Sequence, residues 1–117
     1  MTQLIVHPVM VIPVIGEVRH TNIRMHPNAR YETLKKLVEP FLNGDKMDHR
    51  AVLYNGERRD LFVGQVAISR RDWDIRNIRA SEILNAHVRL LHPDAHDIHL
   101  PAVNGTAVLF PDSRIWF

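Results

Sequence analysis

The dipeptide Asn55-Gly56 is the feature that most constrains how this chain can fold. It stands between two apolar runs, at 50–54 and 60–63. Asn-Gly between such runs is a strong signal for a β-hairpin, because both residues readily adopt the positive φ angles that a tight hairpin turn requires. The sequence therefore predicts an antiparallel strand pair, with Gly64 as a bulge before a further short strand at 65–68.

Other short apolar segments, separated by turn residues, extend this pattern. Residues 4–15 are rich in Val and Ile and are interrupted by Pro8 and Pro13, which predicts two strand pieces at an edge or a bulge. Residues 17–25 carry apolar residues among polar ones, which indicates a half-buried strand. Later strands are expected over 100–103, 106–110 and 114–117, joined by turns at Asn104-Gly105 and Pro111-Asp112-Ser113.

Two segments have the periodicity of amphipathic helices. The first begins after Asn28, a good N-cap residue, and Pro40 should end or kink it. Its apolar stripe consists of Leu34, Leu37, Val38, Phe41 and Leu42. The second helix should run over about 78–91, with Asn77 as its N-cap. His87 falls on the apolar face of this helix, where we interpret it as a packed, hydrogen-bonded residue.

These elements predict an α+β fold, in which two helices pack on one face of a mostly antiparallel sheet of about five to seven short strands. The length of 117 residues fits one domain, residues 1–117. A hydrophobic fraction of 45% and a charged fraction of 24% are ordinary for a folded soluble protein.

Composition and termini bear on the compartment. The chain has no cysteine, which excludes disulfides and thiolate metal ligands and fits a reducing environment. The first residues lack a basic stretch ahead of an apolar run, so no secretory signal is expected. The most apolar region, 4–15, is broken by prolines and is shorter than the roughly twenty residues of a membrane-spanning helix. We expect a cytoplasmic protein with no membrane partner.

A histidine-rich loop at 92–99 is the segment whose side chains best suit metal or proton chemistry. His92, His96 and His99 are interleaved with two aspartates. Imidazole and carboxylate together suit zinc or another divalent metal. Pro93 prevents the three histidines from sharing one helical face, so a solvated loop in which Asp94 caps a turn is the alternative interpretation.

An arginine-rich segment is the best candidate for docking a partner. Arg70, Arg71, Trp73 and Arg76 combine the two residue types most enriched at binding hot spots. Seven arginines stand against four acidic residues over 50–79, so nucleic acid is an alternative partner through residues 70–79. Local salt bridges with Trp73 in the core are the plain structural interpretation.

Trp116 is a second candidate anchor for a partner. If Ile115 and Phe117 face the core of a final strand, Trp116 between them faces outward, because side chains alternate along a strand. An outward tryptophan would pack best against a neighbouring element or a second copy of the chain. Self-association is therefore a further expectation, and closure of the sheet by a last strand is the structural alternative.

Four short strings follow one another from about Tyr31 onward: LKKLV at 34–38, VLYNGE at 52–57, NIRA at 77–80 and NGTAVL at 104–109. In this order they resemble small proteins of bacteriophages, plasmids and integrated mobile elements, the DUF3846 type. The N-terminal part is longer than in that pattern, and residues 69–76 have no counterpart in it. That family has no assigned activity, so the resemblance implies a mobile-element origin and transfers no functional residue.

The motifs of familiar enzymes are missing. The five glycines are scattered singly, so there is no phosphate-binding loop, and no serine stands in a nucleophile-elbow context. We therefore expect a small soluble binding module rather than an enzyme, an accessory or regulatory protein of a phage or mobile element that acts by protein–protein contacts without a cofactor. Binding of nucleic acid through 70–79, or of a metal through 92–99, are the alternatives.

Overall fold

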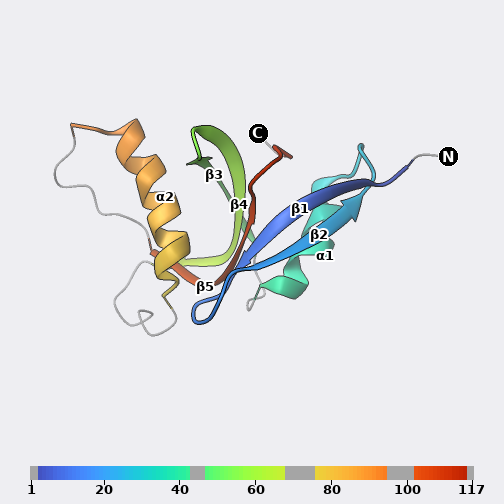
Figure 1. The fold of residues 1–117 in the computed structure, drawn as a ribbon, viewed down its shortest axis with the longest axis horizontal. Coiled ribbons are helices and arrows are strands. Elements are labelled where there is room, and N and C mark those ends of the chain that lie inside the picture. Colours follow the sequence, from blue (N-terminus) through green and yellow to red (C-terminus); the bar gives the residue numbers. More distant parts are fainter. Residues whose placement is uncertain (1–2, 43–46, 68–75, 95–101, 116–117) are drawn as a thin grey trace.

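The computed structural model describes residues 3–42, 47–67, 76–94 and 102–115. Within them, five strands form one sheet in the order β2-β1-β5-β4-β3, and every neighbouring pair is antiparallel (Figure 1). The strands are β1 (Ile5–Ile12), β2 (Arg19–Met25), β3 (Asp48–Tyr54), β4 (Glu57–Ala67) and β5 (Ala102–Phe110). The helices are α1 (Tyr31–Val38), the short 3-10 helix η1 (Glu39–Phe41) and α2 (Ile78–Leu91). The α+β class is confirmed.

β3 and β4 form the predicted hairpin. Tyr54 pairs with Glu57, so Asn55 and Gly56 alone make the turn. Their φ angles are +51° and +80°, positive at both positions, as a type I′ turn requires. A turn of this type matches the right-handed twist of the two strands, which explains why so short a connection is sufficient.

A β-bulge joins segments that the sequence suggested were separate strands. The pairing of β4 with β5 shifts register at Gly64, which faces two residues of β5, Gly105 and Thr106. Gly105 has a φ of +73°, the left-handed geometry of a glycine bulge. The irregularity predicted at Gly64 is therefore confirmed as a register shift, but the extra residue of the bulge belongs to β5, and Gly64 is the residue that faces it. The turn expected at Asn104-Gly105 is wrong, because β5 continues through it as one strand. β4 likewise continues to residue 67.

β1 is one strand rather than two pieces. β5 pairs only with its end, from Met10 to Ile12, so Pro8 lies where β1 has β2 as its one neighbour in the described sheet. This is the edge position that proline tolerates, because it cannot donate to a ladder. At the other end of the chain, residues 113–115 are not in a strand, so the described part of the expected C-terminal hairpin does not form. Residues 116 and 117 lie outside the described ranges.

α1 begins later than expected. Its N-cap position is Arg30, which makes no side-chain capping bond, and not Asn28. The helix ends at Val38 and passes into η1, whose second residue is Pro40. Pro40 has no N–H to donate to the carbonyl four residues earlier, so the regular helix ends before it, although Glu39 itself keeps helical angles (φ −50°, ψ −39°). The predicted end of the regular helix is confirmed.

α2 has the predicted cap and length. The Asn77 side chain accepts a hydrogen bond from the Ala80 amide at 3.0 Å. Its amide group also donates to the carbonyl oxygens of Ile12 at 2.7 Å and Gly105 at 3.0 Å, so one buried side chain starts the helix and ties it to β1 and β5. In the described part of the chain, no helix is long and apolar enough to cross a membrane.

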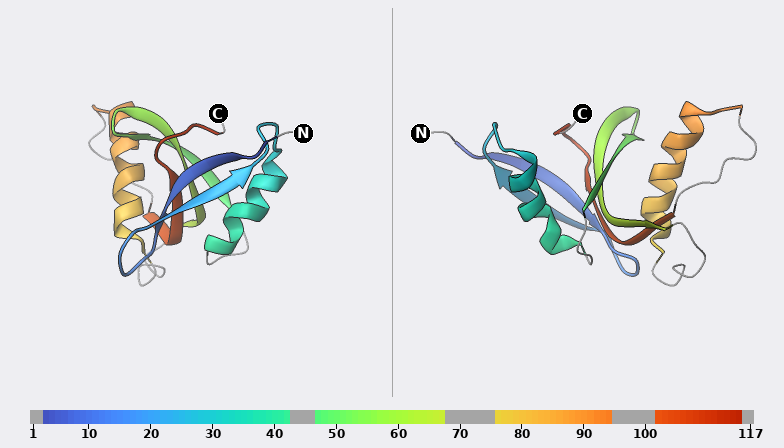
Figure 2. Two further views of the ribbon diagram at one scale, coloured as in Figure 1. Left: turned by 45° about the vertical axis from the view of Figure 1, so that its right-hand side comes forward. Right: turned by 180° about the vertical axis from the view of Figure 1, so that it is seen from behind.

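The two helices cover opposite faces of the sheet, which corrects the expectation that both pack on one face (Figure 2). Leu34 of α1 packs in a cluster that includes Val108, whereas Leu84 of α2 packs in a cluster that includes Leu109. Neighbouring residues of a strand point to opposite faces, so the two clusters lie on different sides. Residues 107–110 are all buried because β5 is covered from both sides.

Candidate functional site

A cleft of about 440 Å³ lies between α2, the β3–β4 hairpin and β1. α2 runs beside this hairpin in Figure 1 and in both views of Figure 2. The apolar residues of its lining are Met10, Ile12, Val18, Leu53, Ile83 and Ala86. Its polar residues are Tyr54, Asn55, Arg79 and Glu82. We call this hollow the α2 cleft.

The α2 cleft forms at the margin of the core cluster beneath α2. Ile12 belongs to that cluster and is fully buried, whereas Met10, Tyr54 and Ile83 pack against it and stay partly buried. The Tyr54 hydroxyl lies 3.6 Å from the Met10 sulfur, to which it donates, and this contact joins the hairpin to β1. Ala86 carries only a methyl group, so α2 does not fill the space in front of the hairpin.

The charges of the α2 cleft come from one flank of the helix. Arg79 and Glu82 are three residues apart and therefore neighbours on the helix surface. The Arg79 guanidinium donates from Nη2 to the Pro13 carbonyl oxygen at 2.6 Å, which fixes it beside the loop after β1. Arg79 is half-buried and Glu82 is exposed. Chemically, this is an apolar hollow with a positioned cation and a solvated anion beside it.

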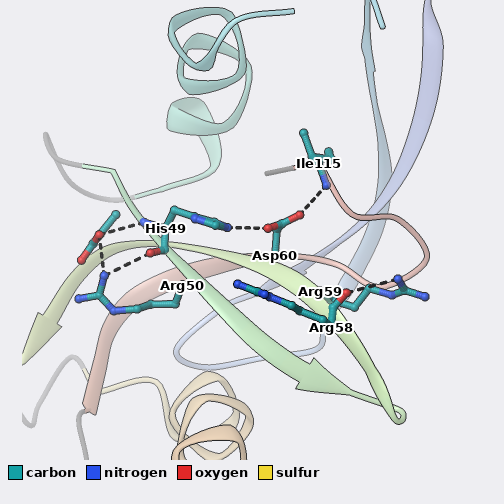
Figure 3. Close-up of polar contacts among 7 residues, drawn as sticks. His49, Arg50, Arg58, Arg59, Asp60 and Ile115 are labelled. Atoms are coloured by element: carbon teal, nitrogen blue, oxygen red, sulfur yellow. Dashed lines mark hydrogen bonds and ion pairs between the residues drawn. The ribbon is translucent and has the colours of Figure 1, made fainter. Parts of the chain in front are cut away.

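A second group of polar side chains lies on the opposite face of the sheet, around Asp60 of β4 (Figure 3). Asp60 is only 1% exposed. One carboxylate oxygen lies 2.6 Å from His49 Nε2, and the other accepts a hydrogen bond from the Ile115 backbone amide, also at 2.6 Å. Asp60 thus connects β3, β4 and the segment after β5, and we call this group the Asp60 clamp.

The Asp60 clamp has the residue types of a proton-transfer pair but the setting of a structural contact. An imidazole next to a buried carboxylate can act as a general base. Here, however, the carboxylate also holds a main-chain amide, and the His49 ring lies against Phe62 with ring centroids 5.0 Å apart. The row of rings continues from Phe62 to Phe110 and on to His7. Burial lowers the pKa of His7, which favours the neutral ring.

Arg76 is the one residue of the predicted docking set that the structure describes. It is half-buried and forms an isolated antiparallel bridge with Asn104 of β5. The other members, Arg70, Arg71, Trp73 and Trp116, lie outside the described residues. The predicted protein interface and its nucleic-acid alternative therefore stay predictions. Arg79, which belonged to the arginine-rich segment of that alternative, lines the α2 cleft.

The histidines of the predicted metal loop are only partly described. His92 is the C-cap residue of α2 and is exposed, whereas His96 and His99 lie outside the described ranges. Within those ranges, no group of three or more His, Cys, Asp or Glu side chains could hold a metal ion. Because the predicted site needs the remaining residues of the loop, it stays a prediction.

His87 is a half-buried residue of α2. Burial is the main reason that its pKa is lowered, and the positive charge of Arg58 adds to the effect. Both causes disfavour the charged imidazolium. Its partial burial agrees with the interpretation of His87 as a packed residue, and the hydrogen bond expected for its ring stays a prediction.

Sequence reasoning missed both sites that the structure describes. For Asp60 a signal was available: it stands two residues before Phe62, so a strand that turns Phe62 inward buries Asp60 on the same face. For the α2 cleft there was none. Its walls come from residues 10–18, 53–55 and 79–86, which are brought together only by the fold.

Comparisons with known proteins do not place this chain in a family. No family model, no curated protein and no solved structure matches it. The resemblance to the DUF3846 type therefore stays a prediction.

Proposed function

We propose that this chain is a small binding module that holds an apolar small molecule in the α2 cleft. The observation that carries the proposal is the make-up of the cleft. Its volume of about 440 Å³ falls in the range of roughly 300–1,000 Å³ that is usual for small-molecule sites. Apolar side chains dominate its lining, with a few polar groups among them, as in sites where polar contacts orient a ligand.

The accessory or regulatory role expected from the sequence is compatible with this proposal. A regulatory module of this kind binds a small effector and changes how it contacts a protein partner. α2 is suited to such a role because its flank lines the cleft, while Asn77 anchors its first turn to β1 and β5. The protein partner predicted to bind residues 70–76 would then respond to the change that the effector causes in this helix.

A fluorescence titration tests the proposal. The probe is N-phenyl-1-naphthylamine, an uncharged dye whose emission rises in apolar surroundings. We expect saturable binding of one dye per chain. Ala86→Trp fills the cleft from an exposed helix position, so it should weaken dye binding about tenfold or more, since even a modest loss of contact of 1.4 kcal/mol has that effect.

The matched control is Lys36→Trp, an exposed position of α1 on the other side of the sheet. It should leave dye binding unchanged, and circular dichroism should show both variants folded. In wild-type protein, NMR amide shifts on adding the dye should map to the three walls of the cleft, residues 10–18, 53–55 and 79–86. Dye binding that survives Ala86→Trp, or shifts that map elsewhere, would contradict the proposal.

A further inference from the structure

We infer that the ligand of the α2 cleft carries an anionic group, such as a carboxylate, which Arg79 binds. This inference rests on the proposed function and adds the chemical class of the ligand: an organic acid with an apolar body. The observation that carries it is that a hydrogen bond to Pro13, in a distant part of the chain, holds Arg79 at the cleft.

The position of Arg79 is set by a contact to a distant part of the chain. Its Nη2 donates to the carbonyl oxygen of Pro13 at 2.6 Å, and its side chain is half-buried. A guanidinium has five N–H donors in a rigid planar fork that matches a carboxylate. One contact that orients the fork therefore leaves other donors available at the cleft, and little rotamer entropy is lost when a ligand binds.

The backbone of α2 adds to the positive potential at this end of the cleft. Asn77 is the N-cap, so Arg79 is the second residue of the helix. The N-terminal turn of a helix carries a partial positive charge that stabilises nearby anions. This effect and the guanidinium act in the same direction, so an anionic group gains from both.

Glu82 is the charge that opposes an anionic ligand. It lines the cleft one turn further along α2 but is exposed to solvent, whereas Arg79 is half-buried. Water and salt screen an exposed charge more strongly than a partly buried one. The balance of the two charges therefore favours an anionic ligand. The alternative is a cationic ligand paired with Glu82, which predicts that the uncharged dye is preferred and that Glu82→Gln removes this preference.

Two dyes with the same ring system provide the test. The first is the uncharged N-phenyl-1-naphthylamine, and the second is 8-anilinonaphthalene-1-sulfonate, which adds a sulfonate. The measured quantity is the ratio of their dissociation constants, so effects common to both dyes cancel. In Arg79→Met we expect the preference for the sulfonate dye to fall about fivefold to tenfold relative to wild type. Arg79→Lys, which keeps the charge without the fork, should fall between the two.

Two further variants make the result specific. Glu82→Gln removes the opposing charge and should raise the preference for the sulfonate dye. Lys36→Met removes a positive charge on α1, across the sheet, and should leave the ratio unchanged. An unchanged ratio in Arg79→Met, or a preference for the uncharged dye that Glu82→Gln removes, would overturn the inference. Failure of both dyes to bind the wild-type protein would instead overturn the proposed function.

Discussion

Asp60 and Asn77 each connect three parts of the chain through one buried side chain. Asp60 joins β3 and β4 to the backbone at Ile115. Asn77 joins α2 to β1 and β5. Both are almost fully buried, and a buried polar group that loses its partner costs about 1–3 kcal/mol. At the scale of the residue, these two side chains should therefore contribute more to stability than the surface ion pairs.

We predict that Asp60→Ala lowers the free energy of unfolding by about 3 kcal/mol, because it leaves the His49 ring and the Ile115 amide without their acceptor. Urea unfolding followed by circular dichroism measures the change. Asp48→Ala is the matched control: Asp48 also accepts from an arginine and a backbone amide, but its side chain is 45% exposed. It should cost less than about 1 kcal/mol. Equal losses of unfolding free energy in the two variants would contradict the prediction that the buried contacts of Asp60 stabilise the fold more than the exposed contacts of Asp48.

At the scale of the element, the bulge between β4 and β5 decides how the two strands pair. Gly105 supplies the left-handed residue that lets β5 take one residue more than β4. A Cβ atom built on Gly105 would have no heavy atom within 4 Å. The cost of an alanine methyl group at this position therefore comes from backbone strain and not from a clash.

We predict that Gly105→Ala lowers the free energy of unfolding by about 1 kcal/mol, the usual penalty for a left-handed Cβ-bearing residue. Gly105→Val should cost more, although valine favours strands, because a β-branched residue rarely tolerates positive φ. Gly105→Asn should cost least, since asparagine visits this region more readily. Urea unfolding of the three variants gives the order, and a valine variant as stable as wild type would show that the bulge is dispensable.

At the scale of the whole molecule, the sheet separates two cores. The cluster under α1 contains Val38, and the cluster under α2 contains Val52; both residues are fully buried. Groups that share no packing partners contribute to stability independently. The two faces should therefore respond separately to changes in packing.

We predict that Val38→Ala and Val52→Ala each lower the free energy of unfolding by about 2 kcal/mol through loss of buried methyl groups. In the double variant, the two losses should add to within about 0.5 kcal/mol. Unfolding curves of the wild type, both single variants and the double variant give the four free energies of a double-mutant cycle, from which the coupling energy is calculated. A coupling energy above about 1 kcal/mol would mean that the sheet transmits packing changes from face to face.

Local features were predictable from the sequence because their causes lie within a few residues. The turn at Asn55-Gly56, the cap at Asn77 and the end of α1 before Pro40 all depend on φ preferences and side-chain to backbone bonds between near neighbours. The class of fold follows from such features, since short strands joined by tight turns form antiparallel sheets.

Two of the three Asn-Gly dipeptides show where that reasoning stops; the third, at 43–44, lies outside the described residues. At residues 55–56 the dipeptide makes a turn, whereas at 104–105 it lies inside β5 with its glycine in a bulge. Both uses need a glycine with positive φ, so the dipeptide alone does not distinguish them. β4, whose facing residue Gly64 lies some forty positions earlier, decides the second case.

The sequence by itself determined the β3–β4 hairpin, the start of α2 and the antiparallel class, because each depends on neighbouring residues. Only the tertiary structure decided that the helices lie on opposite faces and that residues 10–18, 53–55 and 79–86 enclose a cleft. Packing between distant segments depends on the complementary shapes of side chains on every layer. A linear pattern of polar and apolar residues indicates that a segment is buried, but not which segment covers it.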